Sequence, residues 1–147
     1  VDLTVISGFG GEAECADHFL ATFAARIPDA RAFALRHRVL LLRSSTGIPL
    51  DVALGAMPFE ERTVDRSTPF RVAGDIGLRT CSAEDLVVFK AFAGPPQDWI
   101  DIEGIASRQS GRLDADLIWQ ELIPLLILKE DRHTESRLRD LLARSGR

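Results

Sequence analysis

The chain has 147 residues, of which 46% are hydrophobic and 27% are charged, and its formal net charge is −4. This length and composition predict one globular domain with its own core, and the negative net charge gives no reason to expect binding to DNA. No apolar run approaches the roughly 18 residues that a membrane-spanning helix needs, so contact with a membrane is not expected.

Periodicity, capping residues and turn residues predict strands in the first half of the chain and helices in the second. The predicted elements are a strand at 3–6, a helix at 12–26, a hairpin at 38–43 and 48–54, a short helix at 58–65, a hairpin at 70–72 and 76–79, and helices at 82–93, 97–109, 114–129 and 134–143. This order predicts an α+β fold. We expect a single domain in which residues 1–80 carry a mixed β-sheet and residues 81–147 pack on it as helices.

Asp51 lies in the middle of the strand predicted at 48–54. Strand alternation places Leu50, Val52 and Leu54 on one face and Asp51 on the other. Aspartate is depleted in strands, so a central aspartate needs an explanation. It is either a functional residue, a residue on an exposed face or a charge that protects a sheet edge.

Asp2 begins the strand predicted at 3–6 in a similar way, on the face opposite to Leu3 and Val5. If this strand neighbours the strand of Asp51, the two carboxylates lie a few ångströms apart and repel each other. A divalent cation such as Mg²⁺ or Mn²⁺ would remove the repulsion and would suit a phosphate substrate. The alternative for Asp2 is a frayed terminal residue without a function.

Lys90 is the one charged residue of the apolar run 86–93, and lysine is rare in this arginine-rich chain. Its ammonium is expected either to reach the surface or to pair with an anion. Asp98 and Asp101 follow at helical spacing, so both lie on one face of their helix. A solvated acidic face is the structural interpretation of that pair.

The segments 82–86 (SAEDL), 90–93 (KAFA) and 98–102 (DWIDI) resemble the late helical signature of AbiEii-type nucleotidyltransferases. The segment 49–54 (PLDVAL) resembles the family's strand with an isolated aspartate, and 1–4 (VDLT) resembles the end of its DxD strand. This resemblance covers nearly the whole chain and implies the nucleotidyltransferase-like fold of the DNA polymerase β-like superfamily.

The resemblance also implies a mechanism. Asp2 and Asp51 would be catalytic residues that hold Mg²⁺, and Lys90 would be a catalytic residue that contacts phosphate. Asp98 and Asp101 would line the nucleotide site or orient Lys90. The substrate would be a nucleoside triphosphate, and the acceptor a protein or an RNA, as in toxin–antitoxin systems. The family's Gly-Gly or Gly-Ser turn and the first aspartate of the DxD pair would precede Val1, so catalysis is expected only if the parent protein carries them.

Two other interpretations stay open. The first is a catalytically inactive binding or antitoxin-like module with the same fold. The second is a Rossmann-like dinucleotide-binding domain, because residues 8–13 (GFGGEA) match G-x-G-x-x-A after a strand and Asp29 follows about 20 residues later. The scattered histidines and the two distant cysteines give no zinc-site spacing, and lone thiols suit the cytoplasm.

Overall fold

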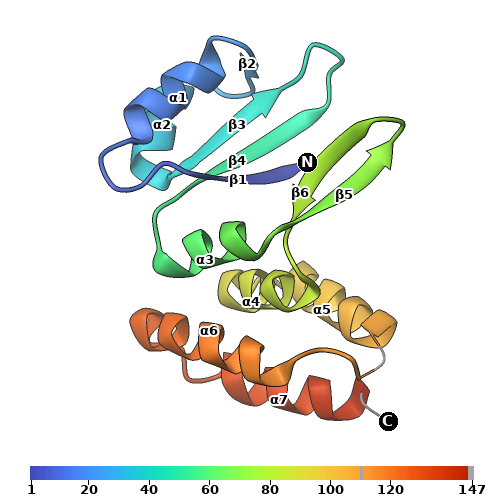
Figure 1. Cartoon of the computed structure of the whole chain (residues 1–147). Coiled ribbons are helices and arrows are strands. Elements are labelled where there is room, and N and C mark those ends of the chain that lie inside the picture. Colours follow the sequence, from blue (N-terminus) through green and yellow to red (C-terminus); the bar gives the residue numbers. More distant parts are fainter. Residues whose placement is uncertain (110, 146–147) are drawn as a thin grey trace. The chain divides into compact units, whose positions relative to one another are not determined.

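The structure is a computed structural model that describes residues 1–109 and 111–145 (Figure 1). The chain divides into two compact units, Val1–Asp65 and Arg66–Arg147. Within the described residues, helices predominate and the strands form a mixed four-stranded sheet and a separate hairpin. The predicted α+β class is therefore confirmed. The unit boundary follows Asp65, so the second hairpin groups with the C-terminal helices.

The sheet of the first unit has the strand order β1 (Asp2–Ile6), β4 (Pro49–Gly55), β3 (Val39–Arg43) and β2 (Ala24–Ala25). β1 runs parallel to β4, while β3 runs antiparallel to both β4 and β2. The hairpin predicted at 38–54 is confirmed as β3 and β4. Because β4 lies between two strands, Asp51 does not protect a sheet edge.

One face of this sheet is covered by α1 (Glu12–Leu20) and α2 (Ala30–His37). Alternation along β3 and β4 directs every second side chain toward these helices, and the two helices contribute small alanines that allow close approach. The buried residues of this core are Ala16, Ala34, Leu40, Leu42, Val52 and Leu54. The opposite face of the sheet carries the residues between them, Asp51 included.

The helix predicted at 12–26 ends earlier, at Leu20, and that prediction is wrong for its last turn and a half. The backbone N–H groups of Thr22 and Phe23 both donate to the carbonyl of Phe19, which turns the chain. The chain then runs along β3 as β2, because its backbone groups find partners there: Arg26 N–H donates to the carbonyl of Leu41 at 2.9 Å.

The second unit contains a four-helix arrangement of α4 (Ala83–Ala93), α5 (Pro96–Gln109), α6 (Ala115–Lys129) and α7 (Thr134–Ser145). Ser82 caps α4, because its hydroxyl accepts from the backbone N–H of Asp85 at 3.0 Å. The buried core of these helices is Val87, Val88, Ala91, Trp99, Ile102, Ile105, Ala106, Ile118, Leu122, Leu125, Leu126, Leu138 and Leu141. Among the described residues, no helix is both long and apolar enough to cross a membrane.

The same unit begins with Arg66, the last residue of α3 (Pro58–Arg66), and with the hairpin of β5 (Thr68–Ala73) and β6 (Ile76–Thr80). The predicted two-residue turn at Gly74 and Asp75 is confirmed, since Ala73 and Ile76 are partners across it. Every residue of this hairpin is exposed.

A buried ion network lies within the second unit. The Arg66 guanidinium contacts Asp85 at 2.5 Å and Glu121 at 2.8 Å. The side chains of Asp85 and Glu121 are 0% and 1% exposed. Burying carboxylates is costly unless a cation compensates them, so Arg66 fixes α4 and α6 around this point.

Candidate functional site

The first candidate cluster, within the first unit, is a pair of carboxylates on neighbouring parallel strands. Asp2 of β1 is the register partner of Asp51 of β4. Neighbouring strands lie about 4.8 Å apart, and register partners point to the same face. Both carboxylates therefore lie on the sheet face opposite to the helix-covered core, with Asp2 exposed and the Asp51 side chain 45% exposed. The condition set out from the sequence, that the strands of Asp2 and Asp51 are adjacent, is therefore met.

Arg26 is a further member of this cluster that sequence reasoning missed. Its guanidinium forms an ion pair with Asp51 through Nη2. Its Nε atom is buried and has no hydrogen-bond partner among the described residues. Arg26 was expected at the end of the helix predicted at 12–26, and only the return of the chain along β3 brings it to Asp51. The guanidinium removes part of the carboxylate repulsion for which we expected a metal ion.

The Asp2–Asp51 pair fits a magnesium ion with substrate phosphates better than a metal site made of protein ligands alone. Within the part of the chain that the structure describes, no group of three or more aspartate, glutamate, histidine or cysteine side chains is arranged to hold a metal. Magnesium commonly takes only one or two carboxylates and completes its shell with water and phosphate oxygens. Two carboxylates are therefore sufficient protein ligands for that type of site.

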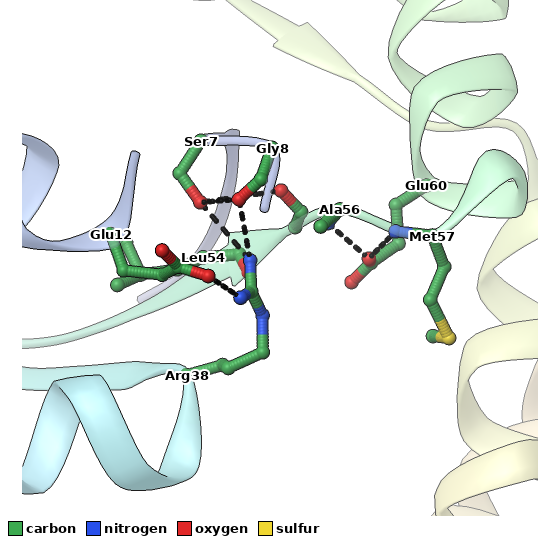
Figure 2. A network of polar contacts seen from close by, with 9 residues as sticks. Ser7, Gly8, Glu12, Arg38, Leu54, Ala56, Met57 and Glu60 are labelled. Carbon is green, nitrogen blue, oxygen red and sulfur yellow. Dashed lines mark hydrogen bonds and ion pairs between the residues drawn. The ribbon is translucent and has the colours of Figure 1, made fainter. Parts of the chain in front are cut away.

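Arg38 holds the loop between β1 and α1 against the C-terminal end of β4 (Figure 2). The Arg38 guanidinium donates to the carbonyl of Leu54 at 2.8 Å and to Ser7 Oγ and the carbonyl of Gly8, both at 3.1 Å. It also forms an ion pair with Glu12 in the first turn of α1. Backbone hydrogen bonding and then Arg38 lower the pKa of Glu12. This network holds the glycine-rich loop in one conformation.

The backbone continues the same arrangement toward α3. The N–H groups of Ser7 and Gly8 donate to the carbonyl of Gly55 at 3.0 and 3.1 Å. Glu60 Oε2 accepts from the N–H groups of Ala56 and Met57, both at 2.9 Å, which satisfies the start of α3 (Figure 2). The C-terminal ends of β1 and β4, the strands that carry Asp2 and Asp51, are thus joined by hydrogen bonds from Ser7 and Gly8 to Gly55.

The dinucleotide-binding interpretation is not favoured by this topology. After the glycine-rich loop and α1, the next strand is β2, which is antiparallel to β3 and two strands away from β4. A Rossmann half requires the chain to return as a parallel neighbour of its first strand. Here the parallel neighbour of β1 is β4, the second strand of a hairpin.

A second candidate cluster, within the second unit, is a lysine held by two aspartates. Lys90 Nζ of α4 donates to Asp101 Oδ2 at 2.7 Å and to Asp98 Oδ1 at 2.9 Å, both in α5. The prediction that one face of α5 carries both aspartates is confirmed, and that face is not merely solvated. Two of the three ammonium donors are used, which leaves one for another acceptor.

Electrostatics keep this second cluster ionised. Desolvation lowers the pKa of Lys90, but the hydrogen bonds and charges of Asp101 and Asp98 outweigh it, and the net pKa lies above the ordinary value. The hydrogen bond from Lys90 lowers the pKa of Asp101. The ammonium of Lys90 and the carboxylate of Asp101 therefore stabilise each other's charged forms.

The structure brings the predicted residues together in two groups: Asp2 with Asp51 in the first unit, and Lys90 with Asp98 and Asp101 in the second. The two cysteines take no part in either group. Cys15 and Cys81 are free, and burial raises the pKa of both thiols, as suits structural residues.

No protein-family model matches the sequence, and no curated protein is significantly similar to it. The family resemblance therefore depends on the aspartate strand and on the helices of Lys90, Asp98 and Asp101.

Proposed function

We propose that the chain is a nucleotidyltransferase-like protein of the AbiEii type, which transfers a nucleoside monophosphate from a nucleoside triphosphate to a protein or RNA acceptor. The observation that carries the proposal is the parallel register of β1 and β4, because it sets Asp2 and Asp51 side by side on the sheet face away from the helices. A toxin–antitoxin role in the cytoplasm is the setting that we propose with it.

In this proposal Asp2 and Asp51 hold a magnesium or manganese ion. The ion, when bound, neutralises charge on the substrate phosphates. Arg26 has to release or share Asp51 when a ligand arrives. Its guanidinium, whose Nε has no partner among the described residues, then donates to a phosphate oxygen beside the carboxylates.

Lys90 has the complementary role in the proposal. Asp98 and Asp101 fix its ammonium with two hydrogen bonds, and its remaining donor serves a phosphate oxygen. The two aspartates are positioning residues here. They outnumber the single ammonium, but their hydrogen bonds restrict the rotamers of the flexible lysine side chain.

The decisive experiment is a calorimetric titration of Mg²⁺, followed by each nucleoside triphosphate. Asp51→Asn is expected to weaken Mg²⁺ binding by at least roughly tenfold, since it removes a ligand. The matched control is Asp75→Asn in the exposed β5–β6 turn, which should bind Mg²⁺ unchanged. Arg26→Gln should retain Mg²⁺ binding, because it frees Asp51, and should weaken triphosphate binding.

A second variant separates ligand loss from the effect of an unpaired Arg26. The double variant Asp51→Asn/Arg26→Gln has no unpaired guanidinium at this position, and the proposal requires that it still fails to bind Mg²⁺. Recovery of binding in the double variant would show that Asp51 only balances Arg26, and the proposal would then be wrong.

The alternative is a catalytically inactive binding or antitoxin-like module, and a specific observation favours it. Asp51 and Lys90 already have ionic partners within the chain, in Arg26 and in Asp98 with Asp101. Charges that are balanced inside the protein need neither metal nor nucleotide. Absence of heat with Mg²⁺ and with every triphosphate, in a protein that melts cooperatively, would support this alternative.

A further inference from the structure

The second unit contains a surface hollow of about 610 Å³ that the proposed function does not use. It lies where the end of α4 and the start of α5 meet the turn between α6 and α7, and its lining includes Trp99, Lys129, Arg132 and Arg137. We call it the basic hollow. Its volume lies within the range of about 300–1,000 Å³ that is usual for small-molecule sites.

Two cations of the basic hollow are held in place by aromatic rings. The Arg137 guanidinium lies 4.0 Å from the ring centroid of Trp99, a residue that is 4% exposed. Lys129 Nζ donates to the carbonyl of Phe92 at 2.7 Å and lies 5.4 Å from its ring centroid. A guanidinium held over an aromatic ring does not spend its N–H donors on that contact, so they remain available for an anion.

The donors of these cations are largely unused. Within the described residues, Arg132 and Arg137 have no hydrogen bond or ion pair with another side chain, and Lys129 uses one donor of three. His133 adds a further donor to the lining. The hollow thus gathers free cationic groups in a chain whose net charge is −4.

Two acidic residues also line the hollow, and they leave an excess of positive charge. Asp131 is committed to the start of α7: its oxygens accept from the N–H groups of His133 and Thr134 at 2.9 and 3.0 Å and from Thr134 Oγ1 at 2.8 Å. These backbone hydrogen bonds, that of His133 first, lower the pKa of Asp131. Glu130 is exposed at the end of α6. Three permanent cations therefore face two carboxylates.

We infer that the basic hollow binds an oligophosphate chain. A single carboxylate could engage only one of the three separated cations, whereas linked phosphates present several charges and acceptors along their length. The phosphates can belong to a free nucleotide or to an RNA strand, and both sources offer the same chemistry to Lys129, Arg132 and Arg137. This inference does not depend on the proposed function.

The test uses tripolyphosphate, ATP and a short single-stranded RNA, each titrated without a divalent cation so that Asp2 and Asp51 do not contribute. Trp99 and Trp119 are the two tryptophans of the chain, so Trp119→Phe leaves Trp99 as the only indole. We expect a saturable fluorescence change with tripolyphosphate. Lys129→Gln/Arg137→Gln should weaken binding by about tenfold or more.

The matched control is Arg139→Gln in the unaltered background. Arg139 also lies over a tryptophan, Trp119 at 4.4 Å, and pairs with Glu135, but it does not line the hollow. The Arg139→Gln variant should bind the three probes with unchanged affinity. If the double variant does not fold, Arg132→Gln replaces it, because Arg132 is exposed and has no internal partner to lose.

The probes also identify the source of the phosphates. If tripolyphosphate and ATP bind and the Lys129→Gln/Arg137→Gln variant loses that binding, the inference is supported with a free nucleotide as the ligand. If only the RNA binds and the variant loses that binding, the inference is supported with an RNA strand as the ligand. The inference is overturned if no probe binds, if the variant binds all probes unchanged, or if Arg139→Gln loses as much affinity as the variant.

Discussion

At the scale of single residues, strand alternation predicts on which face the Asp51 side chain lies, but not which residue pairs with it. Alternation predicts that its side chain lies opposite to Leu50, Val52 and Leu54, and the buried core confirms this. The nature of its partner was not predictable, because Arg26 is 25 positions away and reaches Asp51 only through the turn after α1. A pattern within one strand contains no information about which distant cation folds onto it.

Arg66 supplies a stability prediction at the same scale. Arg66→Gln removes the ion pairs that Arg66 makes with the buried carboxylates of Asp85 and Glu121, so the free energy of unfolding should fall by about 3–5 kcal/mol. The control Arg139→Gln removes an ion pair with Glu135 whose side chains are about half exposed, and such pairs contribute roughly 1 kcal/mol or less. Urea denaturation measures both, and equal losses would contradict the importance of the buried network.

At the scale of elements, most strands and helices were predicted to within one or two residues at each end, but the segment 21–37 was not. α2 (Ala30–His37) was missed altogether, and only Ala30 and Ala34 of its eight residues are buried. Alanines on one face make a weak apolar signal, so periodicity cannot identify such a helix. Its two flanking residues, Asp29 and Arg38, adopt left-handed conformations that the tertiary contacts impose.

The loop between β1 and α1 gives an element-scale prediction. A Cβ atom on Gly11 would lie 2.2 Å from the backbone oxygen of Ser7, which cannot move while Arg38 holds the loop. Gly11→Ala should therefore lower the free energy of unfolding by about 1–3 kcal/mol.

The control for that variant is Gly77→Ala in β6, where an added Cβ has no heavy atom within 4 Å. Alanine in a strand is favoured over glycine by about 0.5–1 kcal/mol, so Gly77→Ala should be neutral or slightly stabilising. Thermal melts of the two variants compare them directly. Similar melting temperatures for Gly11→Ala and the unaltered protein would mean that the loop relaxes.

At the scale of the whole molecule, the proposed function also gives Lys90 of the second unit a role in triphosphate binding. Lys90→Met should fold and melt cooperatively, but it should weaken triphosphate binding by roughly fivefold to a hundredfold, as loss of a charge-assisted hydrogen bond does. Calorimetry with the best-bound triphosphate measures it. Arg112→Met, which alters an exposed residue that bonds only the carbonyl of Gln109, is the control. Undiminished binding would remove Lys90 from the nucleotide site.

The sequence by itself determined the α+β class, the two hairpins and the bounds of the C-terminal helices to within one or two residues. It also determined on which face of its strand each of Asp2 and Asp51 lies. These properties depend on neighbours within a few residues, which the order of amino acids contains directly. The tertiary structure decided the pairing of Asp2 with Asp51, the ion pairs of Arg26 and Arg66, and the gathering of cations from α6 and α7 around Trp99. Those contacts join residues 19 to 55 positions apart, and only the packing of the elements selects them.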